Sequence, residues 1–153
     1  MKRIALSFLA LVMMLSLVAC GGESGKKVEL SAVYEELCGI APEMILIEDA
    51  NMRLNLLGIQ EDDCVQVITA VCADGLRTDE IWLIEAKDAA ALERIQALAE
   101  NRLFAKGEES ITYSPEQYAI VQKAETVTAG QYFALLVSPD VDAMKTVAES
   151  ALN

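Results

Sequence analysis

The sequence contains no histidine, and only 12 Lys and Arg stand against 24 Asp and Glu in its 153 residues, a formal net charge of −12. Histidine is the most common general base and zinc ligand, so its absence removes the central residue of most hydrolase mechanisms and zinc sites. Nucleic-acid binders concentrate Lys and Arg on one face to displace counterions, which this chain cannot easily do. We therefore expect no nucleic-acid partner.

Motifs of the common enzyme classes are also missing. The chain has no Gly-x-Ser-x-Gly elbow and no Gly-rich phosphate loop. The acidic run Glu61-Asp62-Asp63 lacks the alternating oxygen ligands and the central Gly of a calcium loop, which favours a solvated or helix-starting charge run. The sequence thus predicts no catalytic residue, no metal site and no cofactor. A hydrolase with a carboxylate pair remains the alternative, because such a pair is defined by its separation in space.

Apolar residues, in contrast, make up 54% of the chain, and many of them lie near its start. Met1-Lys2-Arg3 precedes an apolar run over residues 4–18, which as a helix spans about 22 Å and falls short of the ~30 Å hydrocarbon core. This pattern is typical of an export signal. The run ends in Leu17-Val18-Ala19-Cys20, which looks like the lipobox of bacterial lipoproteins. We predict cleavage before a diacylated Cys20; a plain signal peptide is the alternative.

Cleavage at Cys20 divides the chain into three parts. Residues 1–19 are the predicted lipoprotein signal peptide, residues 20–27 a flexible membrane tether and residues 28–153 one globular domain. The mature chain keeps 10 basic and 24 acidic residues, a net charge of −14. The tether reaches only about 15 Å, so we expect an acidic domain held close to the outer face of the cytoplasmic membrane.

Three further cysteines are Cys38, Cys64 and Cys72. The last two bracket an apolar run that reads as a strand, where eight steps separate them by roughly 26 Å. A disulfide needs Cα atoms within ~7 Å, so these two cannot bridge. Either Cys38 pairs with one of them or all three are free, and buried free thiols are the default expectation.

Hydrophobic periodicity predicts the helices and strands of the first half of the domain. Three-four spacing of apolar residues indicates a helix over 30–37, and a second helix is expected over 49–57, ending at Gly58. Apolar and β-branched runs then indicate an antiparallel pair of strands over 64–72 and 80–86.

In the second half of the domain, helical periodicity is again followed by strand periodicity. Asp88 caps a long helix that Gly107 ends. Ser114-Pro115-Glu116-Gln117 forms a capping box for a helix to about residue 124. The remaining predicted elements are a hairpin of strands over 126–128 and 131–138 with Gly130 at its turn, and a last helix that starts at Ser138-Pro139. The order ααββααββα predicts a single α+β domain, with helices packed on about four largely antiparallel strands.

Several short motifs occur together in this framework. They are Asp79-Glu80-Ile81 at the start of a strand, Arg102 late in the long helix, the run from Tyr113 to Tyr118, and Gly130-Gln131-Tyr132. In this order and spacing they resemble the lipoprotein family of domain of unknown function 4358, found in Gram-positive bacteria. The resemblance covers residues 28–152 and agrees with the lipobox. It implies no reaction, because the family has no assigned activity.

Six residues are candidates for binding a partner: Glu80, Trp82, Arg102, Tyr113, Tyr118 and Tyr132. Glu80 and Arg102 could line a cleft and bind a bidentate group, but an exposed ion pair worth under about 1 kcal/mol is the favoured interpretation. Trp82 could stack on a sugar or peptide, with a core position favoured. Tyr113 and Tyr118 flank the helix cap as a hydrophobic staple.

Together these observations predict a non-catalytic, lipid-anchored module of the cell envelope that binds a protein or a cell-wall component. Its acidity favours a partner with basic groups and an association that weakens with salt. The alternatives are a cell-wall or carbohydrate-processing hydrolase and a lipoprotein with a purely structural role.

Overall fold

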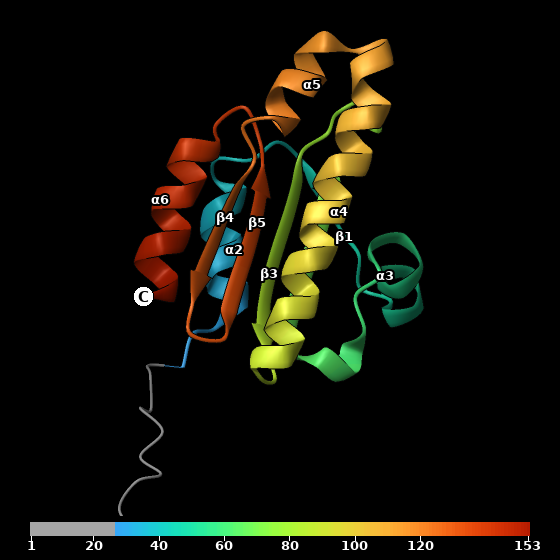
Figure 1. Ribbon diagram of the computed structural model, residues 1–153. Coiled ribbons are helices and arrows are strands. Elements are labelled where there is room, and N and C mark those ends of the chain that lie inside the picture. Colours follow the sequence, from blue (N-terminus) through green and yellow to red (C-terminus); the bar gives the residue numbers. More distant parts are fainter. Residues whose placement is uncertain (1–26) are drawn as a thin grey trace, which may run out of the picture.

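Five strands form one antiparallel sheet in the computed structural model, which describes residues 27–153 (Figure 1). The order in the sheet is β1-β2-β3-β5-β4, and every pairing is antiparallel. The strands are β1 (Met44–Leu46), β2 (Cys64–Cys72), β3 (Glu80–Ala86), β4 (Glu125–Ala129) and β5 (Tyr132–Val137). The continuous apolar runs of β3 and β5 explain their central places, because a strand covered on both faces needs apolar residues on both.

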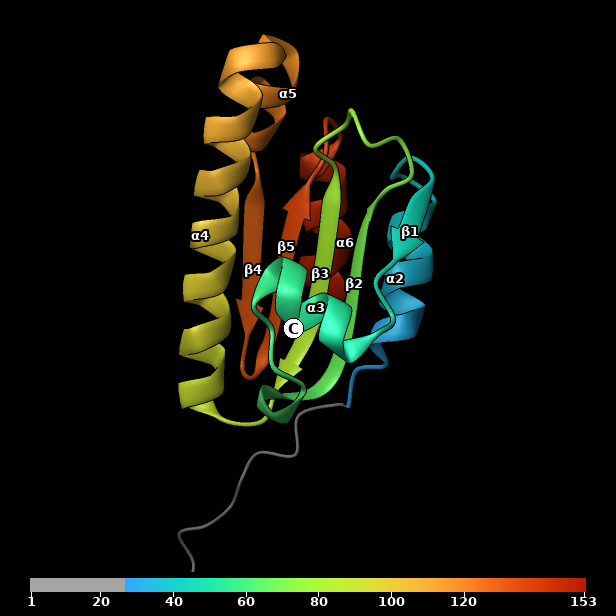
Figure 2. The same ribbon diagram turned by 90° about the vertical axis from the view of Figure 1, so that its right-hand side faces the viewer.

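Helices cover both faces of this sheet (Figures 1 and 2). They are α2 (Leu30–Cys38), α3 (Ala50–Leu57), α4 (Ala89–Tyr113), α5 (Pro115–Val121) and α6 (Val141–Leu152), with a 3-10 turn at Glu61–Asp63. One core layer joins α2 and α6 to the sheet, and it takes Ile81 and Leu83 from β3. The other joins α3 and α4 to the opposite face and takes Trp82 and Ile84. The alternation along β3 therefore places Glu80 and Trp82 on the face that α4 covers.

The predicted fold class is confirmed, and several boundaries match the sequence pattern. β2 and β3 have the predicted bounds. Asp49 and Asp88 cap α3 and α4 by accepting hydrogen bonds from the backbone nitrogens three residues further on, at 2.8 and 2.7 Å. Gly58 and Gly130 have φ of +76° and +57°, the left-handed conformation that the helix end and the hairpin turn require.

The sheet has one strand more than predicted, since β1 pairs with β2 at the edge. The long helix also does not end at Gly107 but continues to Tyr113. A Cβ at Gly107 would lie 3.7 Å from Gln122 and 3.8 Å from Tyr118, so α5 packs closely on this glycine. Pro115 accounts for the actual end, because the residue before a proline avoids helical geometry.

Two other helix predictions need correction. The capping box is only half formed: Ser114 Oγ accepts a hydrogen bond from Gln117 N, but the Gln117 side chain instead accepts hydrogen bonds from the backbone and hydroxyl of Thr78, at 2.8 and 3.0 Å. α5 ends at Val121, three residues early. α6 begins at Val141 and not at Ser138-Pro139, with Asp140 in the N-cap position.

The cysteines of the described part are all free. Cys64 and Cys72 do not bridge, as the strand geometry predicted, and no disulfide joins either of them to Cys38. The expectation of three buried thiols holds for Cys72 alone, because Cys38 is exposed and Cys64 is only partly buried. Burial raises the pKa of the Cys64 thiol to about 11, so this group stays protonated and unreactive at neutral pH.

The predicted signal peptide at residues 1–19 and the lipidation site Cys20 lie outside the described residues, as does the predicted tether up to residue 26. From residue 27 onward, no helix is both long and apolar enough to span a bilayer.

Candidate functional site

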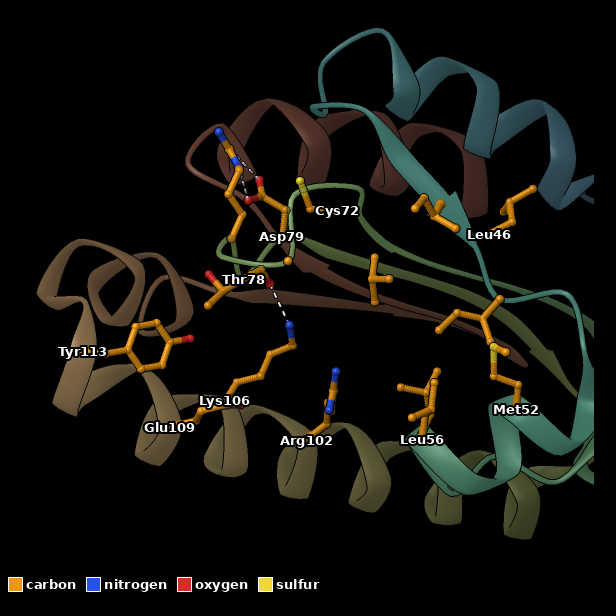
Figure 3. A pocket seen from close by; sticks show the side chains of 16 residues that line it. Leu46, Met52, Leu56, Cys72, Thr78, Asp79, Arg102, Lys106, Glu109 and Tyr113 are labelled. Carbon is orange, nitrogen blue, oxygen red and sulfur yellow. Dashed lines mark hydrogen bonds and ion pairs between the residues drawn. The ribbon is translucent and has the colours of Figure 1, made fainter.

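A cleft of about 340 Å³ lies between β1, α3, α4 and the loop before β3 (Figure 3). Its two ends differ in chemistry. Leu46, Met52 and Leu56 form an apolar end, while Asp79 and Lys106 belong to a polar end. Met52 and Leu56 are 51% and 56% exposed, so this apolar wall faces solvent.

Arg53 holds the helix that forms this apolar wall. Its buried guanidinium donates hydrogen bonds to the backbone oxygens of Ile47 and Glu48, just after β1, and to the side chain of Glu61 in the 3-10 turn. These contacts tie α3 to the segments before and after it. They leave the outward-facing side chains of α3 uncovered beside the cleft.

Glu80 lies behind the polar end of the cleft and is completely buried. Arg102 Nε lies 3.0 and 3.1 Å from its two carboxylate oxygens, and Arg102 Nη2 lies 2.9 Å from Oε2. Lys106 Nζ lies 2.8 Å from the same oxygen, and the indole nitrogen of Trp82 donates to Oε1 at 2.7 Å. We call Glu80, Arg102 and Lys106 the inner cluster.

Electrostatics keep the carboxylate of the inner cluster charged. Burial alone would raise the pKa of Glu80, but Lys106 and Arg102 outweigh it and hold this pKa below its usual value. Lys106 Nζ also donates to the backbone oxygen of Thr78 at 2.9 Å. The inner cluster therefore contains two cations and one anion.

An ion pair with no net charge, Arg77 with Asp79, lies beside the inner cluster. Arg77 donates to both carboxylate oxygens of Asp79 at 2.9 and 3.2 Å, and this partner raises the pKa of Arg77. The two charges cancel, so the pair leaves the balance of the inner cluster unchanged.

A second cluster of the same composition lies near the start of α4, and we call it the outer cluster. Asp63 accepts hydrogen bonds from Arg94 at 2.9 and 2.6 Å, and Lys87 Nζ lies 3.2 Å from it. The hydrogen bond from Arg94 lowers the pKa of Asp63 to about 2, with help from Lys87 and against the effect of burial. Of the two interpretations of the acidic run, solvated or helix-starting, the solvated one is wrong for Asp63, which is buried and paired within the 3-10 turn.

The structure brings together three of the six predicted site residues, since Glu80 binds Arg102 and accepts a hydrogen bond from Trp82. Because Glu80 is 0% exposed, Glu80 and Arg102 form an internal ion pair and not the expected surface pair. Tyr113 also lines the cleft and is exposed.

Of the six candidates, only Arg102 and Tyr113 line the cleft. Trp82 is completely buried, as the favoured core position required, and offers no platform for stacking. Tyr118 lies against Gly107. Tyr132 accepts a hydrogen bond from Val28 N at 3.1 Å through its hydroxyl, on the opposite face of the sheet.

Sequence reasoning missed Lys106 and the apolar wall. The spacing of Arg102 and Lys106 was an available signal, since residues four apart lie on one face of a helix. The apolar wall gave no such signal, because exposed and buried leucines look the same in a sequence.

A second hollow, of about 510 Å³, lies between α2, β2 and the end of β1. Although its volume is larger, its buried cation, Arg53, is already engaged by Ile47, Glu48 and Glu61. Within residues 27–153, no three His, Cys, Asp or Glu side chains come close enough to hold a metal ion. The cleft at the inner cluster is thus the stronger candidate.

Comparison with known proteins gives one match. The model of a family described as Domain of unknown function (DUF4358) matches residues 41–138, a stretch that contains both walls of the cleft. No curated protein and no solved structure matches the chain.

Proposed function

Since the chain belongs to the DUF4358 family, a domain of unknown function, we propose from its geometry that it is a non-catalytic binding module of the cell envelope. In this proposal, lipidated Cys20 holds the domain at the outer face of the cytoplasmic membrane. The cleft between β1, α3 and α4 takes up part of a protein or cell-wall partner. The observation that carries the proposal is the exposed apolar wall, which lines the same cleft as Arg102 and Lys106 of the inner cluster.

Exposed apolar side chains next to a few fixed polar groups are typical of binding sites. Met52 and Leu56 are each more than half exposed although they are apolar. Arg102, held by Glu80, supplies a fixed polar group at the other end. Because Glu80 already holds Arg102 in place, this polar group needs little reorganisation when a partner binds.

Two carboxylates at the polar end of the cleft, Glu80 and Asp79, support binding over hydrolysis. A carboxylic acid that protonates a leaving group needs a raised pKa, whereas the pKa of Glu80 is lowered. Asp79 is held by Arg77. Incubation of the protein with purified wall fragments tests this point: saturable binding without turnover supports the module, and turnover would establish the carboxylate-pair hydrolase.

Anchoring rests on the lipobox of residues 17–20 and has its own test. Cys20→Ala removes the acylated side chain, so we expect the protein to leave the membrane fraction and to change its electrophoretic mobility. Retention in the membrane fraction with unchanged mobility would refute the anchor.

Photo-crosslinking in intact cells tests the cleft as the binding surface. A photoreactive amino acid replaces Leu56 in the cleft, and a matched variant carries it at Phe104, which is exposed on α4 outside the cleft. We expect a specific crosslinked product from position 56 alone, weaker at high salt if the partner is basic. Equal products from both positions would refute a cleft-specific partner.

A further inference from the structure

We propose that the cleft binds a carboxylate attached to an apolar chain, with the carboxylate on Arg102 and the chain along Leu46, Met52 and Leu56. This inference rests on the proposed function, because it names the ligand chemistry of the same cleft. Charge, hydrogen-bonding capacity and shape each support it.

The inner cluster has one positive charge in excess. Glu80 supplies a single negative charge to Arg102 and Lys106, and the side chain of Lys106 is only 10% exposed. Arg77 and Asp79 cancel each other, and Glu109 stands on the rim with its side chain in solvent. Arg102 is 29% exposed, so water solvates the excess charge only in part, and a poorly solvated charge without a counter-charge is unfavourable. A monoanion at this end of the cleft would restore the balance.

Arg102 has a hydrogen-bond donor left for that anion. Glu80 engages its Nε and Nη2, while Nη1 has no partner among the described residues. Every buried side-chain nitrogen and oxygen of the described part has a partner, so Nη1 is open to solvent. Because Arg102 lines the cleft, a carboxylate there can accept from this guanidinium.

The far end of the cleft selects for an apolar chain. Leu46, Met52 and Leu56 line it at a distance from Thr78 and Asp79 (Figure 3). A ligand with a charged head alone would leave these side chains in water. The volume of about 340 Å³ lies at the small end of the range for ligand pockets. These dimensions and the single excess charge together favour a short-chain carboxylate over a phosphate dianion.

The protein contains its own reporter for this site. Trp82 is the only tryptophan of the chain, and its indole donates to the carboxylate that holds Arg102. We therefore expect its fluorescence to change when an anion binds. The full chain, in phosphatidylcholine vesicles and with empty vesicles as blank, is titrated with butanoate, hexanoate and octanoate. Affinity should rise by up to about fourfold per methylene, while octanol and octylamine should give no saturable change.

Matched variants separate the two ends of the cleft. Arg102→Gln should weaken octanoate binding at least tenfold, whereas Arg94→Gln, on the same helix with a similar carboxylate partner, should not. Leu56→Gln should remove the increase in affinity from butanoate to octanoate. Leu54→Gln, exposed on the same helix but outside the cleft, should keep it. The two leucine variants change exposed side chains, so they test the inference even if Arg102→Gln fails to fold.

The proposed ligand class would be refuted if octanoate and octanol bound equally well. It would also be refuted if Leu56→Gln and Leu54→Gln lost the affinity gain from butanoate to octanoate to the same extent. The inference and the proposed function can also fail separately. A crosslink at position 56 without octanoate binding would leave the binding module standing and refute the carboxylate. Octanoate binding without a crosslink would support the carboxylate site and refute the envelope partner.

Discussion

The inner and outer clusters lie along the same helix and consist of the same groups. Each has one carboxylate, an arginine of α4 that binds this carboxylate through two nitrogens, and one lysine. They differ in their access to water. The side chains of Arg94 and Lys87 are 50% and 41% exposed, whereas those of Arg102 and Lys106 are 29% and 10% exposed. Since the two clusters share their charged groups, any difference in their properties comes from their surroundings.

Surroundings decide what such a cluster can do. At the outer cluster, water solvates the excess positive charge, so the contacts mainly fasten the 3-10 turn to α4. At the inner cluster, the same excess charge lies in a poorly solvated place, where electrostatic interactions are stronger. Identical chemistry therefore gives a structural contact at one end of the helix and a candidate anion site at the other.

Removing each carboxylate in turn tests this difference most strongly. Glu80→Gln leaves the buried Lys106 and the partly buried Arg102 without a counter-charge, and we expect the free energy of unfolding to fall by about 3–5 kcal/mol. Asp63→Asn leaves cations that water can solvate, and its loss should be clearly smaller. Urea denaturation followed by circular dichroism measures both. Equal losses would mean that burial does not distinguish the clusters.

Acid titration gives the next largest effect. The pKa of Asp63 is lowered to about 2, below the value of about 3.9 expected in the unfolded chain. Its charged form therefore stabilises the fold above pH 4, and this contribution disappears as the pH falls through 2. Between pH 5 and pH 2 the wild type should lose stability more steeply than Asp63→Asn. If the free energy of unfolding fell equally steeply with pH in both proteins, the pairing of Asp63 with Arg94 would be contradicted.

Much of this architecture follows from local chemistry. The β-branched runs of β2 and β3 and the cap at Asp88 depend on residues close in the chain, and these predictions are confirmed. β1 is different: it has three residues and is a strand only because it pairs with β2. A strand this short gives no periodicity to read.

The site was harder to predict because its parts come from distant segments. Glu80 meets Arg102 and Lys106 across 22 and 26 positions, and nothing local to Glu80 indicates that it is buried. Only the four-residue spacing of the two cations was visible in the sequence. The wall from α3 lies opposite them because Arg53 fastens that helix, a contact that requires the folded chain.

Gly107 makes the two halves of α4 unequal in a further way. It lies beside Lys106 inside the helix, where glycine costs roughly 0.5–1 kcal/mol relative to alanine. A Cβ there would meet Gln122 and Tyr118 at ordinary contact distances. Gly107→Ala should therefore raise the free energy of unfolding by about that amount, and Ala97→Gly, exposed in the first half of α4, should lower it similarly. If Gly107→Ala were destabilised instead, the packing of α5 on α4 would require that residue 107 has no side chain.

Salt should produce the smallest change and the sharpest contrast between the clusters. At 1 M ionic strength the screening length is about 3 Å, which weakens interactions between solvated charges far more than those between buried ones. Double-mutant cycles of Asp63→Asn with Arg94→Gln and of Glu80→Gln with Arg102→Gln, in 0.05 M and 1 M NaCl, measure the two coupling energies. We expect the Asp63–Arg94 coupling to fall with salt and the Glu80–Arg102 coupling to persist. If both fell equally, water would reach the inner cluster as it reaches the outer one, and the buried excess charge on which the anion site depends would not exist.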